Sequence, residues 1–96
     1  MTKRYVLDFL REHKEEMKEK FGIEKIALFG SYARDEATDN SDVDIVILKA
    51  SNITLSKRLK AKQMLEESLK VKVDLGYFDS MKTFIKNRIT KDLVYV

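Results

Sequence analysis

Two aspartates separated by a single residue, Asp42 and Asp44, begin an apolar run that is typical of a buried strand. Side chains at positions i and i+2 of a strand point to the same face, so the two carboxylates would lie about 7 Å apart. Two like charges on one face repel each other unless a cation lies between them. Mg²⁺ is the natural candidate, because it binds one or two carboxylates together with substrate phosphates. The alternative is a solvated entrance to the strand.

A third aspartate, Asp74, lies within a stretch of alternating apolar and polar residues from Val71 to Tyr77. The alternation predicts a strand with Asp74 on its polar face. Beside the other two carboxylates, Asp74 could complete a site for two metal ions, one activating the attacking oxygen and the other steadying the leaving phosphate. It could also accept the proton of an attacking hydroxyl. The alternative is the exposed face of an edge strand.

A phosphate-binding turn is suggested by Gly30 and Ser31, which stand at a predicted junction between a strand and a helix. Glycine allows a tight turn and a close approach to a ligand, and the first amide groups of a helix attract anions. Arg34 is expected on the same side of this helix, near its positive end, where an anionic partner would explain a cation. The alternatives are an ordinary helix cap at Ser31 and a surface pair of Arg34 with Asp35 or Glu36.

The elements that would position these residues can be predicted from hydrophobic periodicity, from Thr2 as a cap and from Gly22 as a stop. They are a helix over 3–20, a strand over 23–29, a short helix over 31–36, a strand over 42–48, a helix over 54–69, a strand over 71–77, a helix capped by Asp79 or Ser80, and a short strand over 93–96. The predicted fold is of the α/β (α+β) class, with a small mixed β-sheet flanked by helices in the order α-β-α-β-α-β-α.

The predicted core uses both faces of the strand over 42–48, because apolar residues continue on its two sides and imply cover on both. Apolar residues at helical spacing are expected to face inward from the two later helices. In the helix over 54–69 they are Leu55, Leu59, Ala61, Met64, Leu65 and Leu69, and in the last helix they are Met81, Phe84, Ile85 and Ile89.

Length and composition limit the classes of protein that fit this chain. Its 96 residues suffice for one domain, which we expect to span 1–96. The chain has no Cys and a single His, which excludes thiolate and His-rich metal sites. The charges are interspersed and sum to +3, a pattern that does not indicate nucleic-acid binding. The apolar runs are too short to cross a membrane, so we expect a soluble, cytoplasmic protein.

Two segments, Leu28 to Arg34 and Ser41 to Ile47, resemble the signature of the DNA polymerase β-like nucleotidyltransferase superfamily. Within this superfamily the chain is most similar to the minimal nucleotidyltransferases, or MntA-type antitoxins. The resemblance covers nearly the whole chain and implies the nucleotidyltransferase fold. It also implies that Gly30 and Ser31 hold the triphosphate of ATP with the help of Arg34.

In the same way the resemblance implies that Asp42 and Asp44 bind two Mg²⁺ ions, with Asp74 as the third acidic residue. Members of this group are encoded beside HEPN-domain toxins. The resemblance therefore implies an adenylyltransferase that moves AMP from ATP to a tyrosine hydroxyl of the cognate HEPN toxin. The alternative is an antitoxin that neutralises its toxin by binding alone. Because the chain is short, we expect the partner to supply the acceptor; the oligomeric state stays open.

Overall fold

The computed structural model describes residues 1–96 as an alternation of helices and strands, which confirms the predicted order and the mixed α/β class. None of the helices combines the length and the apolar character needed to cross a membrane. In chain order the elements are α1 (Lys3–Glu12), α2 (Lys14–Phe21), β1 (Ile23–Phe29), α3 (Gly30–Ala33), β2 (Val43–Ala50), α4 (Leu55–Leu69), β3 (Val73–Tyr77), the 3₁₀ turn η1 (Phe78–Ser80), α5 (Thr83–Thr90) and β4 (Val94–Tyr95).

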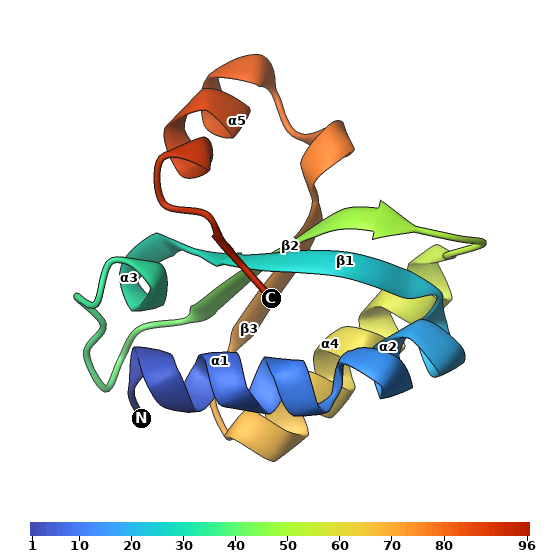
Figure 1. Cartoon of the computed structure of the whole chain (residues 1–96), viewed down its shortest axis with the longest axis horizontal. Helices are drawn as coiled ribbons and strands as arrows, with labels where there is room; N and C mark the ends of the chain where they lie inside the picture. The colour runs from blue at the N-terminus through green and yellow to red at the C-terminus, as the bar shows by residue number, and fades with distance from the viewer.

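The four strands form one sheet in the order β3-β2-β1-β4. β2 and β3 run parallel and are joined by α4, while β1 is antiparallel to both β2 and β4. Since β2 and β3 point the same way and β1 points the other way, the beginnings of β2 and β3 meet the end of β1 (Figure 1). Three segments that are distant in the sequence therefore meet at one end of the sheet.

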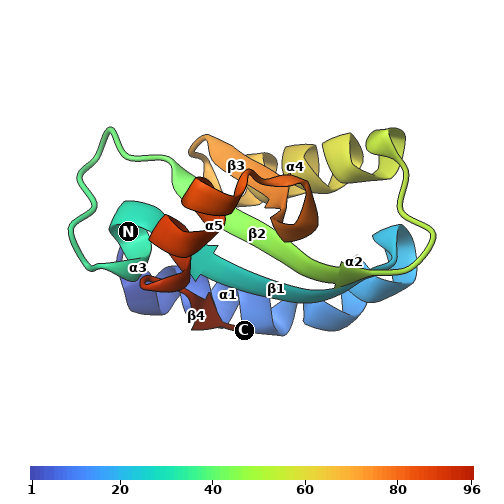
Figure 2. The ribbon, with the colours of Figure 1, turned by 90° about the horizontal axis from the view of Figure 1, so that it is seen from above.

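The two faces of the sheet are covered unequally. α1, α2 and α4 lie against one face and form a core of 18 buried residues, whereas α5 crosses the other face (Figures 1 and 2). The second face buries only Ala27, Val46 and Ile89. Val43 and Ile45 of β2 belong to the larger cluster and Val46 to the smaller, so the prediction that this strand is covered on both sides is confirmed.

The helix expected over 3–20 is interrupted at His13. The ring of this residue stacks on Phe9, and its Nδ1 lies 2.8 Å from the carbonyl oxygen of Phe9, one helical turn earlier. Side chains that bond to the preceding turn in this way bend or break helices. Both predicted ends are confirmed: the Thr2 hydroxyl accepts a hydrogen bond from the amide of Tyr5, and Gly22 ends α2 in the left-handed conformation.

Three residues predicted to face the core are exposed. Leu55 and Leu59 of α4 are 62% and 51% exposed, and Phe84 of α5 is 65% exposed. α4 buries Ala61, Leu65 and Leu69, and at 3.6 residues per turn Leu59 lies about 160° around the helix from Ala61 and about 120° from Leu65. Leu55 is the first residue of the helix. By the same geometry Phe84 lies about 140° from Ile89, the buried residue of α5. Each helix contacts the sheet along one narrow stripe, so the prediction of wider apolar faces was wrong.

Several predicted boundaries also shift. The strand expected over 42–48 runs from Val43 to Ala50, and the one expected over 71–77 begins at Val73. The predicted cap of the last helix at Asp79 or Ser80 was wrong, because these residues form η1 and α5 begins after Lys82 without a side-chain cap. The predicted terminal strand is confirmed as β4, which pairs with β1.

The attachment of α5 depends on Ile89, since no other residue of this helix is buried. We expect Ile89→Ala to lower the free energy of unfolding by about 2–4 kcal/mol, because it leaves a cavity beside Ala27 and Val46. Phe84→Ala on the exposed side of α5 is the matched control, with an expected change below about 1 kcal/mol. Urea unfolding followed by circular dichroism measures both, and equal losses in the two variants would contradict this account of the packing.

Candidate active site

The beginning of β2 places Asp44 between the two other segments that meet at this end of the sheet. The strand register pairs Asp44 with Phe29, the last residue of β1, and with Asp74 of β3 on the other side. Gly30 follows Phe29 and begins α3. The two predicted sequence motifs and the isolated Asp74 are thus brought together by backbone pairing.

Gly30 touches Asp44 so closely that no larger residue fits. Its φ of +75° lies in the left-handed region, and a Cβ atom at this position would overlap the Oδ2 atom of Asp44. The predicted tight turn at Gly30 is therefore present, and the group that it approaches within the chain is a carboxylate. The close approach to a ligand stays a prediction. Glycine is needed here both for the backbone conformation and for space.

The start of α3 carries no side-chain cap. Phe29 precedes the helix as its N-terminal flanking residue, so the alternative that Ser31 is an ordinary cap was wrong. Ser31 is the second residue of α3 and is partly exposed. The amide groups of the first turn are therefore left without the side-chain acceptor that usually satisfies them, and such amide groups attract anions.

The charges of Asp42, Asp74 and Arg34 all act on the carboxyl group of Asp44. The pKa of the Asp44 carboxyl is raised from 3.8 to about 6, first by burial and then by the negative charges of Asp74 and Asp42. The positive charge of Arg34 opposes this effect and lowers the pKa. Three predicted site residues thus influence the carboxyl group of a fourth, Asp44.

Asp42 and Asp74 are exposed, in contrast to the half-buried Asp44. Asp42 lies just before β2, one residue outside the strand that was expected to contain it, and β3 is an outer strand of the sheet. The alternatives of a solvated strand entrance and an exposed edge strand therefore describe these two positions correctly. The repulsion on Asp44 shows that both positions still belong to one cluster.

The donor set of this cluster suits magnesium. Carboxylate oxygens are the hard ligands that Mg²⁺ prefers, and repulsion between ionised aspartates favours a cation among them. No three Asp, Glu, His or Cys side chains lie close enough together to hold a metal ion, so the structure does not assemble Asp42, Asp44 and Asp74 into the predicted set of three metal ligands. Mg²⁺ does not need such a set, since it is usually bound by one or two carboxylates plus waters and substrate phosphates.

Arg34 lies at the C-terminal end of α3, because the helix stops at Ala33. The expectation that it stands near the positive end of the helix was wrong, and so was the argument from the helix dipole. Its guanidinium pairs instead with Asp92 at 2.9 Å and with Glu36 at 3.4 Å. The pair with Glu36 is one of the predicted alternatives, whereas the pair with Asp92, which is 58 residues away, is not predicted by the sequence.

A hollow of about 390 Å³ lies beside Asp44 on the sheet face that carries α5. This volume falls within the range of small-molecule sites. Two guanidinium groups and two carboxylates are among its lining residues, which are Phe29, Gly30, Arg34, Asp44, Arg88, Ile89 and Asp92. Sequence reasoning missed Arg88 and Asp92, whose only signal is their spacing of four residues near the end of the last helix.

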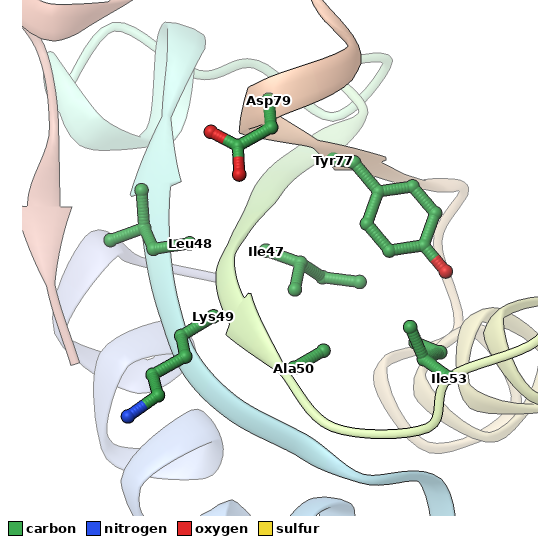
Figure 3. A pocket seen from close by; sticks show the side chains of 7 residues that line it. All are labelled: Ile47, Leu48, Lys49, Ala50, Ile53, Tyr77 and Asp79. Carbon is green, nitrogen blue, oxygen red and sulfur yellow. The ribbon is translucent and has the colours of Figure 1, made fainter.

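A second hollow lies at the opposite ends of β2 and β3. It measures about 260 Å³ and is bordered mainly by apolar side chains, among them Ile47, Ile53 and Tyr77 (Figure 3). Its charged groups are Lys49 and Asp79. None of the predicted site residues lines it, so the first hollow is the candidate active site.

Comparison with known proteins agrees with this geometry. The family model described as a nucleotidyltransferase domain matches residues 10–96. The chain belongs to the nucleotidyltransferase family. This confirms the resemblance that the Gly-Ser and Asp-x-Asp segments indicated, and it establishes the protein as an enzyme of the nucleotidyltransferase class.

Two relatives of this nucleotidyltransferase come from archaea. The protein adenylyltransferase MntA of Thermococcus cleftensis is 36% identical over 96 residues, which cover 100% of this chain and 97% of the relative. A protein of Methanocaldococcus jannaschii with a provisional assignment as a protein adenylyltransferase is 41% identical over 92 residues, or 95% of this chain and 94% of the relative.

Two solved structures share the fold of this nucleotidyltransferase. One is provisionally described as a minimal nucleotidyltransferase and has a TM-score of 0.78 at 25% identity, covering 98% of this chain and 95% of its own. The other is a toxin–antitoxin complex with AMP-PNP, with a TM-score of 0.69 at 26% identity, covering 99% of this chain and 72% of the solved one. The predicted nucleotidyltransferase fold is therefore confirmed.

Proposed function

We propose that this nucleotidyltransferase is the antitoxin of a HEPN/MNT pair and transfers AMP from ATP to a tyrosine hydroxyl of its cognate HEPN toxin, with Mg²⁺ as cofactor. The observation that carries the proposal is the contact between Gly30 and Asp44 beside Asp74, at the edge of a hollow with two arginines. The MntA relative and the toxin–antitoxin complex with AMP-PNP support the choice of substrate and partner.

Each site residue has a role in this reaction. Asp44 and Asp42 would bind Mg²⁺, which when present neutralises charge that develops on phosphate oxygens. The first turn of α3, from Gly30, and the side chains of Ser31 and Arg34 would bind the triphosphate. Asp74 would either join the metal ligands once nucleotide and metal are bound or take the proton of the attacking hydroxyl.

All the atoms that change partners in the proposed step belong to ATP and to the toxin. The tyrosine oxygen forms a bond to the α-phosphorus, the bond from that phosphorus to the bridging oxygen of the β-phosphate breaks, and pyrophosphate leaves. The tyrosine proton passes to a carboxylate of the cluster or to water. The hollow supplies groups for phosphate binding, and the HEPN toxin would bring the acceptor.

Transfer is tested by incubating the protein with the cognate HEPN toxin, Mg²⁺ and ATP radiolabelled on either the α- or the γ-phosphate. We expect the toxin to gain the α-label and the mass of whole AMP units, and to gain no γ-label. The variant Asp42→Ala/Asp44→Ala should leave the toxin unlabelled. If the wild-type protein leaves the toxin unlabelled but inactive, neutralisation occurs by binding alone. If the toxin gains the γ-label, the reaction is phosphorylation.

The ion pair between Arg34 and Asp92 should compete with the nucleotide. We expect Asp92→Asn to lower the KM for ATP by about two- to fivefold, because it frees Arg34 from an exposed ion pair that water screens. Glu36→Gln, which removes the longer of the two pairs, should have a smaller effect. Steady-state kinetics of toxin labelling measure both, and a higher KM for Asp92→Asn would mean that Asp92 positions Arg34 rather than competing for it.

A further inference from the structure

Arg88 of α5 lines the hollow beside Asp44, although neither the sequence motifs nor the resemblance pointed to it. The helix crosses one face of the sheet (Figure 2), where its Ile89 packs against Val46. Asp44 lies two residues before Val46 in β2 and so points to the same face. Arg88 therefore extends the candidate site to a part of the chain that is 58 residues beyond Gly30.

The packing around Arg88 fixes the position of its backbone. The next residue, Ile89, is buried against Ala27 and Val46, and its carbonyl accepts a hydrogen bond from the amide of Asp92 at 2.9 Å. β4 follows at once and pairs with β1. This part of α5 is thus held at both ends against the sheet, so the side chain of Arg88 starts from a defined place at the border of the hollow.

The charge of Arg88 is not matched within the chain. Arg34, the other guanidinium of the hollow, forms ion pairs with Asp92 and Glu36. Arg88 forms no ion pair with any residue of the chain, and the carboxylate of Asp92 is already engaged by Arg34. An arginine that borders a hollow without an acidic partner is suited to an anion, and its planar donor fork matches phosphate oxygens.

We propose that Arg88 is a phosphate-binding residue of the active site, whose guanidinium binds the polyphosphate of ATP from α5 while the first turn of α3 binds it from Gly30. The inference rests on the proposed function, since it assumes ATP as the substrate. In this arrangement α5 contributes directly to the nucleotide site, in addition to covering one face of the sheet. The C-terminal segment then sets the affinity for the triphosphate.

Two substitutions at Arg88 test this role against a matched control on the same helix. Arg88→Gln removes the charge and Arg88→Lys keeps it without the planar fork. Lys91→Gln removes an equal charge at the exposed end of α5, outside the hollow. Since Arg88 is exposed, we expect all three variants to unfold at the wild-type temperature.

We expect Arg88→Gln to raise the KM for ATP in toxin labelling by about ten- to a hundredfold with little change in kcat, because a charged hydrogen bond to phosphate is lost from ground state and transition state alike. Arg88→Lys should fall between Arg88→Gln and the wild type, and Lys91→Gln should match the wild type. Calorimetric titration without toxin should show the same loss for Mg²⁺-ATP and for inorganic pyrophosphate.

The outcomes separate the two proposals. A wild-type protein that binds Mg²⁺-ATP but labels no toxin overturns the proposed function, while titrations of Arg88→Gln still test the role of Arg88. Unchanged affinity of Arg88→Gln for ATP and pyrophosphate overturns the inference. Weaker binding of Arg88→Gln to the HEPN toxin, with unchanged ATP affinity, also overturns it and assigns the arginine to the protein interface.

Discussion

Replacing Asp44 with Asn is expected to lower adenylyl transfer at least about a hundredfold and at the same time to raise the Tm of the protein at neutral pH. The loss of activity follows from the removal of the half-buried carboxylate at the centre of the cluster. The gain in stability follows from the same position, because an ionised Asp44 is costly beside Asp74 and Asp42 in a partly buried site. Function and stability thus oppose each other at this residue.

The pKa of Asp44 determines how the difference in Tm between Asp44→Asn and the wild type depends on pH. The pKa of Asp44 is raised from 3.8 to about 6 in the folded protein, so the folded state holds its proton more tightly than the unfolded state. Below pH about 4 the carboxyl is protonated in both states, and the substitution changes little. As pH rises through about 6 the folded state must carry the unfavourable charge. The advantage of Asn in Tm should therefore develop between pH about 4 and about 6 and be complete at pH 7.

Thermal unfolding at a series of pH values, without added metal, measures the effect. Asp39→Asn is the matched control, because Asp39 is exposed in the loop before β2 and does not act on the pKa of Asp44. It should change neither Tm nor transfer. Adding Mg²⁺-ATP should raise the Tm of the wild type and not that of Asp44→Asn. An Asn variant that is less stable than the wild type at pH 7 would contradict the electrostatic account.

Gly30→Ala is expected to have the second large effect, a loss of about 1–3 kcal/mol in the free energy of unfolding together with loss of transfer. The new methyl group would overlap the carboxylate of Asp44, and the positive φ of Gly30 disfavours any residue with a Cβ. Either the turn into α3 or the side chain of Asp44 must move. Both changes would separate the turn that we propose to bind phosphate from the carboxylate cluster.

Substitutions of the two other glycines of the chain distinguish a loss of stability from a loss of activity. Gly22 also has a positive φ, and a Cβ there would overlap the backbone carbonyl of Ser51, which follows the end of β2 opposite to Asp44. Gly22→Ala should therefore lose stability but keep transfer at temperatures where it is folded. At Gly76 a Cβ would lie 3.4 Å from the flexible end of Met81, and Gly76→Ala should be tolerated. Denaturant unfolding and toxin labelling compare the three variants, and equal transfer by Gly22→Ala and Gly30→Ala would contradict a special role for Gly30.

The part of the site that the sequence predicted depends on local rules. Alternation along a strand is enough to assign Asp44 and Asp74 to a face, and a glycine at the end of an apolar run is enough to predict the turn at Gly30. The crossover helix between β2 and β3 is typical of parallel neighbours. To predict that Asp44 pairs with Asp74, one must also know the register of the two adjacent strands. The sequence pattern alone does not provide this register.

The part that could not be predicted depends on packing between distant segments. Arg34 and Asp92 are 58 residues apart, and they meet only because Ile89 and β4 fix the end of α5 to the sheet. The exposure of Leu59 has a similar origin, because α4 turns the stripe containing Leu65 toward the sheet and leaves the other apolar side outside. Periodicity identifies apolar sides of a helix, but the available contact surface decides which of them is buried.

The order of the strands also bears on aggregation. An outer strand exposes backbone donors and acceptors that can pair with another molecule, and natural sheets limit this with short outer strands and charged side chains. Here one outer strand, β4, has two residues, and the other, β3, has five and carries the exposed carboxylate of Asp74. The charge of Asp74 thus disfavours strand pairing at the longer free edge, an effect that is independent of its role in the proposed reaction.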